Sequence, residues 1–169
     1  VKAIGDQVDP HFPSKDDNLN EELCRVLCFL QHPSVVGKTV ALMQVTKAKV
    51  PDFDAEVMKR NRGYGGTILN SMQSAPNILN IHFLFCLKDV QAGWGMDERK
   101  VYLGELKTLL SKSGGNMFKG YINKIRESAL ANVPEEDKAS LQYLMGDIKS
   151  IDLATLPKAM GPPVAWTVE

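Results

Sequence analysis

Cysteine and histidine recur at a helical spacing in two parts of the chain. Cys24, Cys28 and His32 follow one another at steps of four residues, and His82 and Cys86 repeat that step. Residues four apart lie on one face of a helix. Two such helices side by side would gather thiolates and imidazoles, which are ligands that zinc prefers. The alternative is that the cysteines are small core residues and that His32 interacts with the end of its helix.

We favour the core interpretation, because structural zinc sites mostly use tighter ligand spacings on loops or turns. The three cysteines are then free and buried, and we expect no metal-binding residue. The chain has no C-x-x-C motif, so it offers neither a redox pair of that type nor a covalent attachment site for c-type haem.

Other signatures of catalysis are missing from the sequence. The glycine-rich stretches 63–66 and 114–116 do not fit a phosphate-binding loop. The sequence has no G-x-S-x-G motif and no evident Ser, His and Asp set. The charged runs 97–100 and 135–138 are typical of the first turn of a helix. We therefore expect no catalytic residue and no cofactor in this chain.

An aromatic loop residue has two interpretations. Trp94 stands between two glycines, just before a charged helix start. The favoured interpretation is structural: the indole packs over the helix ends, with Arg99 and Tyr102 from the next helix nearby. The alternative is a platform for a ligand or partner, and it makes Tyr64, Trp94 and Arg99 a candidate interaction surface.

Composition excludes several classes of protein. The chain has 169 residues, 44% of them hydrophobic, with 20 basic and 20 acidic side chains. This length suits one domain, or two very small ones. A neutral balance argues against nucleic acid as the partner. No apolar run approaches the roughly 20 residues that a bilayer span needs. The first residues lack the regions of a signal peptide, so we expect a leader to have been removed or the chain to be part of a longer protein.

Apolar residues at steps of three and four predict an all-α fold with seven or eight helices. The first helix begins near Asn18 or Asn20, one of which we expect to cap it. The segment 78–90 is apolar on nearly all sides, which favours the most buried helix over a buried strand. The expected helices span about 18–30, 34–48, 54–62, 68–74, 78–90, 96–112, 118–130 and 134–148.

These helices predict three regions along the chain. Residues 1–17 form an extended lead-in, 18–150 form the helical domain, and 151–169 form a tail or linker rich in proline. The first two helices, joined by a short turn around Pro33, are typical of one unit of an α-solenoid.

Six groups of residues, taken in chain order, form one extended pattern. They are Phe12-Pro13 with Asn20-Glu21-Glu22-Leu23 and Leu27; His32-Pro33-Ser34-Val35-Val36 with Lys38-Thr39 and Ala41-Leu42; Arg60-Asn61-Arg62-Gly63-Tyr64-Gly65; Gly93-Trp94 with Arg99 and Tyr102; Gly114-Gly115-Asn116 with Phe118, Gly120-Tyr121, Ile125-Arg126 and Ala129-Leu130; and Trp166-Thr167-Val168. The pattern resembles the HEAT-like helical region of large bacterial cell-envelope proteins that carry a β-propeller dehydrogenase-like module upstream and a c-type cytochrome module downstream.

The resemblance implies HEAT-like helix pairs, export from the cytoplasm to the periplasm or cell envelope, and a haem module beyond the chain. We therefore expect a non-catalytic scaffold or interaction domain within a larger, exported and redox-associated protein. Its partners would be neighbouring domains of that protein or another protein. The alternative is the substrate-facing part of an enzyme, around Tyr64, Trp94 and Arg99, with the catalytic module elsewhere.

Overall fold

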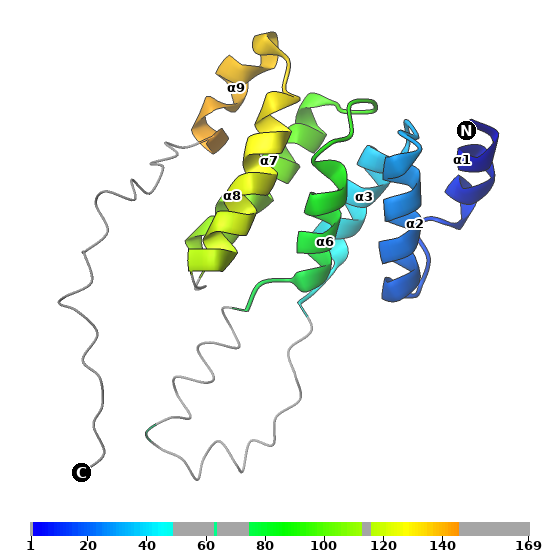
Figure 1. Ribbon diagram of the computed structural model, residues 1–169, viewed down its shortest axis with the longest axis horizontal. Coiled ribbons are helices and arrows are strands. Elements are labelled where there is room, and N and C mark those ends of the chain that lie inside the picture. The colour runs from blue at the N-terminus through cyan, green and yellow to red at the C-terminus, as the bar shows by residue number, and fades with distance from the viewer. Residues whose placement is uncertain (1, 49–62, 64–74, 113–115, 146–169) are drawn as a thin grey trace, which may run out of the picture.

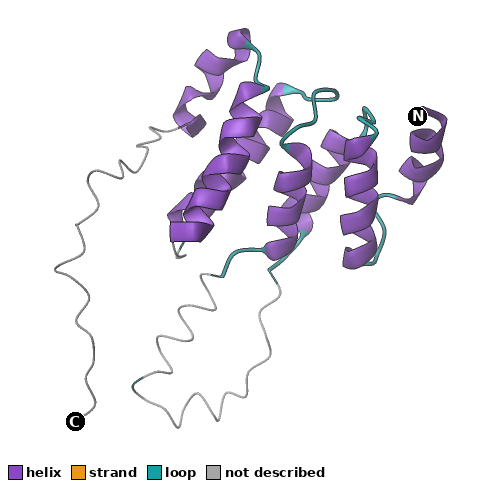
Figure 2. Ribbon diagram, viewed as in Figure 1, coloured by secondary structure: helices purple, strands orange, loops and turns teal. Residues whose placement is uncertain are grey.

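The computed structural model describes residues 2–48, 63, 75–112 and 116–145, and every regular element in these ranges is a helix (Figure 1, Figure 2). The prediction of an all-α fold is confirmed. The helices expected at 54–62 and 68–74, and the tail at 151–169, lie outside the described residues. The elements are α1 (Lys2–Val8), the 3-10 helix η1 (Asp9–His11), α2 (Asp17–Phe29), α3 (Val35–Val45), α6 (Ile78–Leu87), α7 (Met96–Ser111), α8 (Asn116–Ala131) and α9 (Glu135–Met145).

The helices from α2 onward form two layers. In one layer α2, α6 and α8 pack side by side, and in the other α3, α7 and α9 do so. The layers are joined where α2 packs on α3 and α7 packs on α8. Figure 1 shows the row running from α1 at one end to α9 at the other. Successive described helices therefore alternate between the two layers.

The hydrophobic core follows the predicted periodicity, because each helix turns its apolar stripe towards the neighbouring helices. All of the residues named next have at most 2% of their surface exposed. The largest of these core side chains are Phe12, Leu27, Val35, Phe83, Leu84, Leu87, Tyr102, Leu106, Leu109, Ile122, Ile125 and Leu141.

Helix α6 is not buried on all sides, contrary to the prediction for 78–90. Phe83 and Leu84 are fully buried, but Ile78 is 71% exposed and Phe85 is 44% exposed. The helix is flanked by α2 and α8 and covered by α3. Its remaining side therefore has no helix of the described chain against it. The helix also ends at Leu87 rather than at 90.

The lead-in is not extended, so the prediction for 1–17 is wrong over its first part. Residues 2–8 form α1 and 9–11 form η1, and the chain becomes extended only at Phe12, with φ −114° and ψ 130°. Helix α1 packs closely against His32 because the buried Gly5 has no side chain. A Cβ at this position would lie 2.9 Å from Cδ2 of His32. Tertiary contacts therefore stabilise a short helix that has no local signal.

The cap of α2 is also corrected. The carboxylate of Asp16, rather than Asn18 or Asn20, accepts the N–H of Leu19 at 3.0 Å. Asn20 is buried and exchanges two hydrogen bonds with the backbone of Ser14, at 2.7 and 3.1 Å. The predicted helix starts at 78 and 96 are confirmed, and α9 begins at 135, beside its predicted start.

Candidate functional site

The two helices that carry the Cys/His pattern, α2 and α6, are neighbours, and their thiol and imidazole groups meet. Sγ of Cys24 lies 3.8 Å from Sγ of Cys28 on the same helix, and Cys28 and Cys86 line one cleft. Sγ of Cys86 lies 3.4 Å from Nε2 of His82. That nitrogen is also 3.1 Å from the carbonyl oxygen of Glu21. Four residues proposed from their spacing are thus brought together.

His32 is not a member of this cluster. Its Nδ1 lies 2.9 Å from Oγ of Ser34 and its Nε2 lies 3.3 Å from Oδ1 of Asp6, on the side of α1. Across the described ranges, no group of three or more His, Cys, Asp or Glu side chains is arranged to hold a metal ion. The three cysteines are free; Cys24 and Cys28 are buried and Cys86 is half-buried.

The environment of the thiols favours their protonated form. The hydrogen bond with Cys28, together with burial, raises the pKa of Cys24 to about 12. The hydrogen bond with Cys24 and burial likewise raise the pKa of Cys86. The hydrogen bond with Cys86 raises the pKa of His82, against the opposing effect of burial. Because the thiolate is the reactive form, these cysteines are weak nucleophiles at neutral pH.

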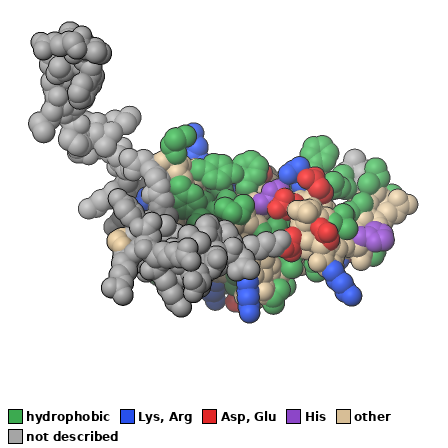
Figure 3. Space-filling view, turned by 90° about the horizontal axis from the view of Figure 1, so that it is seen from below, with side chains coloured by type: hydrophobic (Ala, Val, Ile, Leu, Met, Phe, Trp, Pro, Cys, Tyr) green, Lys and Arg blue, Asp and Glu red, His purple; other side chains and the backbone are tan. Residues whose placement is uncertain are grey.

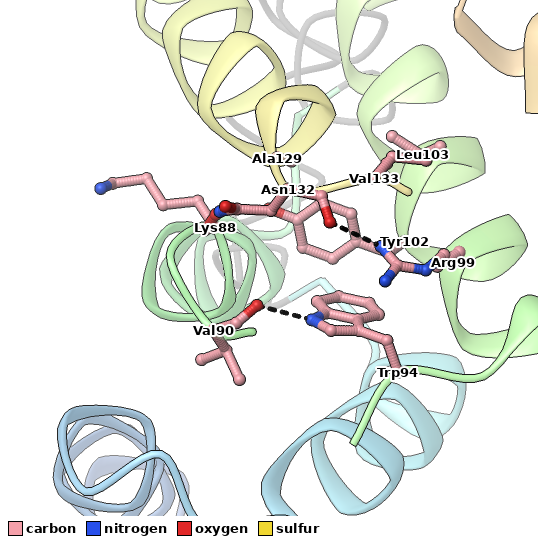
Figure 4. A pocket seen from close by; sticks show the side chains of 9 residues that line it. All are labelled: Lys88, Val90, Trp94, Arg99, Tyr102, Leu103, Ala129, Asn132 and Val133. Carbon is pink, nitrogen blue, oxygen red and sulfur yellow. Dashed lines mark hydrogen bonds between the residues drawn. The ribbon is translucent and has the colours of Figure 1, made fainter. Parts of the chain in front are cut away.

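The second site is the junction around Trp94, between α6 and α7 (Figure 4). The indole N–H donates to the carbonyl oxygen of Val90 at 2.7 Å. The indole meets the ring of Tyr102 edge-on, with centroids 5.1 Å apart, and Cζ of Arg99 lies 5.4 Å from the indole centroid. The hydroxyl of Tyr102 donates to the carbonyl oxygen of Leu84 at 2.7 Å. The predicted position of Trp94, with Arg99 and Tyr102 nearby, is confirmed.

Arg99 lies inside the protein, although the sequence made it part of a candidate surface. It is 8% exposed, its guanidinium donates to the carbonyl oxygen of Asn132 at 3.4 Å, and Nε lies 3.6 Å from Asp137 (Figure 4). Burial lowers the pKa of Arg99, and the charge of Asp137 acts in the opposite direction. The cavity beside it measures about 10 Å³, close to the smallest space that holds one water molecule. Tyr64, the third residue of that surface, lies outside the described residues.

A third cluster, which the sequence did not reveal, joins the N-terminal helices to the turn between α2 and α3. His32 bridges Asp6 and Ser34, and the hydroxyl of Ser34 donates to the carboxylate of Asp9. Nζ of Lys38 lies 2.8 Å from the same carboxylate. We call Asp6, Asp9, His32, Ser34 and Lys38 the N-terminal clasp. Because the hydroxyl of Ser34 donates its hydrogen bond to the carboxylate of Asp9 and not to His32, the cluster is a structural tie between α1, η1 and the turn before α3.

Exposed hydrophobic side chains gather on one layer. Of ten large hydrophobic residues that are exposed in the described chain, seven belong to α2, α6 or α8. Phe29 is 85% exposed, and Phe85 stacks on Tyr121 with centroids 6.0 Å apart. We call Phe29, Phe85 and Tyr121 the aromatic face. Figure 3, a view from below, shows green side chains gathered along the upper edge of the molecule, with charged groups beside them.

A cleft of about 400 Å³ lies between Phe29 and Phe85, and the side chains of Cys28 and Cys86 also line it. Two ion pairs stand at its edge. Arg25 pairs with Glu22 at 3.0 Å, and Lys88, whose Nζ lies 5.0 Å from the centre of the Phe85 ring, pairs with Asp89. The edge of the cleft therefore carries charges of both signs. No sequence pattern indicated this cleft, because its walls come from two distant segments of the chain.

Comparisons with family models, with curated proteins and with solved structures found no match to this chain. Within the described residues, no helix is long and apolar enough to cross a membrane. The candidate sites therefore rest on their own geometry: the thiol cluster, the Trp94 junction, the N-terminal clasp and the aromatic face.

Proposed function

We propose that this chain is a non-catalytic helical scaffold or interaction domain, built of HEAT-like helix pairs, within a larger exported and redox-associated protein. The single observation that carries the proposal is the aromatic face on one of two stacked helical layers. Stacked helix pairs bury a continuous core between their layers and leave long faces on which partners dock.

The order of the helices supports HEAT-like pairs. The pairs would be α2 with α3, α6 with α7, and α8 with α9, because the first member of each lies in one layer and the second in the other. The pairs are linked inside the described chain by polar contacts as well as by the core. The side-chain amide of Asn80 in α6 donates to the carbonyl oxygen of Met43 in α3 at 3.3 Å, and Arg99 in α7 donates to the carbonyl oxygen of Asn132 after α8 at 3.4 Å.

The chemistry of the aromatic face points to a protein partner. Aromatic residues are enriched at the centres of protein interfaces, and charged residues form the rims. Phe29, Phe85 and Tyr121 supply the centre, and the ion pairs of Arg25 and Lys88 supply a rim with no excess of either sign. The occupant we propose is a folded surface of a neighbouring domain, or of another protein, with an apolar centre and mixed charges around it.

The enzyme alternative receives less support from the same geometry. Trp94 uses its only polar group on Val90, and Arg99 uses its guanidinium on Asn132 and Asp137. Groups that bind substrate must offer unused donors or acceptors in a cleft of adequate size. At the Trp94 junction these donors instead form hydrogen bonds within the protein, which is consistent with a scaffold.

The test places a photo-crosslinking amino acid at position 29 of the full-length protein in the cell that makes it. Val45 supplies the matched control, because it is also exposed but lies on α3, in the other layer. We expect a specific cross-linked product from position 29, identified by mass spectrometry as one neighbouring domain or one partner protein, and none from position 45. Phe85→Asp should abolish that product without changing the circular dichroism spectrum.

Two results would contradict the scaffold proposal. One is equal cross-linking, or none, from the two positions. The other is turnover of a substrate by the isolated chain that is lost on mutation of residues in the Trp94 junction.

A further inference from the structure

We propose that Cys24 and Cys28 form a two-coordinate site for a soft monovalent metal ion, copper(I), beside the cleft between Phe29 and Phe85. Sγ of Cys24 lies 3.8 Å from Sγ of Cys28, and Cys28 lines that cleft. The site goes beyond the scaffold role and does not depend on it. The chain would bind the ion whether or not the aromatic face has a partner.

The distance between the two sulfur atoms fits one ion between them. A bond from a thiolate to a metal ion such as zinc is about 2.3 Å long, so two sulfurs on one ion lie from roughly 3.8 Å apart at a tetrahedral angle to about 4.6 Å apart in a line. The observed 3.8 Å lies at the short end of this range, and a movement of less than about 1 Å makes the arrangement linear. Residues four apart share one face of a helix, and α2 is continuous over both positions. The helix therefore holds the two ligands together before an ion arrives.

The number of available ligands selects the class of ion. Structural zinc takes four ligands, whereas the described residues contain no group of three His, Cys, Asp or Glu side chains that could hold a metal ion. The imidazole nearest to Cys86 is not free, because Nε2 of His82 donates to the carbonyl oxygen of Glu21 at 3.1 Å and so has no lone pair for a metal. Copper(I) is a soft ion that prefers thiolates, and two of them satisfy it. The helical pair is therefore sufficient for copper(I) and insufficient for zinc.

The surroundings of the pair support a buried ion with a path to solvent. Cys24 is fully buried and Cys28 is 6% exposed, so little water competes with the sulfur ligands. Oγ1 of Thr39 lies 3.6 Å from Sγ of Cys24, and its hydroxyl can donate to the thiolate and orient it. Because Cys28 is the member of the pair that lines the cleft, the ion reaches the site past Cys28.

Binding exchanges two protons for one ion. Each thiol loses its proton, each sulfur forms one bond to copper(I), and no electron is transferred. The product carries one negative charge, since two thiolates bind one monovalent cation. The hydrogen bond from Thr39 to Cys24 stabilises this charge.

The experiment titrates the full 169-residue chain, fully reduced and without oxygen, with copper(I) held by the coloured chelator bicinchoninate. We expect each chain to take one ion from the chelator and to release two protons per ion into a weakly buffered solution. X-ray absorption of the copper should show two sulfur neighbours and no nitrogen neighbour, a measurement that needs no variant. Zinc should be lost on dialysis against a chelator.

Variants assign the site to the pair. Cys24→Ala and Cys28→Ser should each lower the affinity for copper(I) by more than about 100-fold, because loss of a mere hydrogen bond to a ligand already costs about 10- to 100-fold. Thr39→Val should cost about 10- to 100-fold and keep one ion per chain. Cys86→Ser is the matched control, because it removes the remaining thiol and should bind as the parent does. Circular dichroism verifies that each variant is folded.

Three results would overturn the copper site. The first is a folded parent chain that takes no copper(I) from the chelator. The second is binding that Cys86→Ser abolishes, or that a folded Cys24→Ala variant retains in full. The third is a copper ion whose absorption spectrum shows a nitrogen neighbour, or fewer than two sulfur neighbours.

Discussion

The indole N–H of Trp94 donates to the carbonyl oxygen of Val90 at 2.7 Å, and this hydrogen bond closes the loop between α6 and α7. The same loop passes tightly against the turn between α2 and α3. Gly93 has φ +82°, and a Cβ there would lie 2.2 Å from the carbonyl oxygen of Pro33. The loop therefore holds the first pair of helices against the second, and a side chain at Gly93 would separate them.

Replacing Trp94 with alanine should lower the free energy of unfolding by about 3 kcal/mol or more, as for other large-to-small changes in a packed site. The change removes the contact with Tyr102, the cation–π contact with Arg99 and the bond to Val90. Urea unfolding followed by circular dichroism measures the effect. Trp94→Phe keeps an aromatic ring but loses the donor, and should cost about 1 kcal/mol. Unchanged unfolding of the alanine variant would show that the indole does not hold the junction.

Local pattern was sufficient for the elements whose signals lie within one segment. Apolar spacing located α2, α3, α7 and α8, and the side chain of Asn77 caps the predicted start of α6. The Trp94 junction was predictable for the same reason, because Trp94, Arg99 and Tyr102 are close in sequence. The four-residue steps of cysteine and histidine also identified the right faces of α2 and α6.

The features that could not be predicted from the sequence depend on contacts between distant segments of the chain. Helix α1 is stabilised where Gly5 lies against the ring of His32. Asp6, which is 26 residues from His32 along the chain, also contacts that ring as part of the N-terminal clasp. The exposure of Phe85 was hidden because a segment that is apolar on all sides does not reveal which side lacks a neighbour. Asn18 and Asn20 resembled helix caps, but the side chain of Asn20 is buried and forms hydrogen bonds with the backbone of Ser14.

The two faces of α6 should respond differently to the same charge. Leu84→Asp should unfold the chain, because Leu84 is fully buried and an unpaired buried charge costs several kcal/mol. Phe85→Asp, one residue away on the exposed side, should leave the melting temperature within a few degrees. Thermal melting by circular dichroism compares them. A soluble Leu84→Asp variant with normal melting would place α6 outside the core.

Docking of α1 should depend on the absence of a side chain at Gly5. In Gly5→Ala the new Cβ would lie 2.9 Å from Cδ2 of His32, so α1 or the ring has to move. Gly37→Ala is the matched control, because Gly37 is also helical and has nothing within 4 Å of the added Cβ. We expect faster amide hydrogen exchange over residues 2–11 in Gly5→Ala. Gly37→Ala should exchange as the parent does and gain up to about 1 kcal/mol of stability.

The N-terminal clasp predicts a loss of stability in acid. Burial alone would raise the pKa of Asp9, but hydrogen bonds from Lys38 and Ser34, with the charges of Lys38 and His32, lower it below the ordinary value of 3.8. A carboxyl group whose pKa is lower in the folded state contributes stability above its unfolded pKa, and this contribution disappears as the pH falls through the folded pKa. The difference in melting temperature between the parent and Asp9→Asn should therefore persist down to about pH 4 and should shrink below pH 3.8. Asp97→Asn removes the same charge from an exposed carboxyl group and should show a smaller difference throughout. Equal differences for the two variants across this range would mean that the contacts of Asp9 with Lys38 and Ser34 do not hold α1 and η1 to the domain.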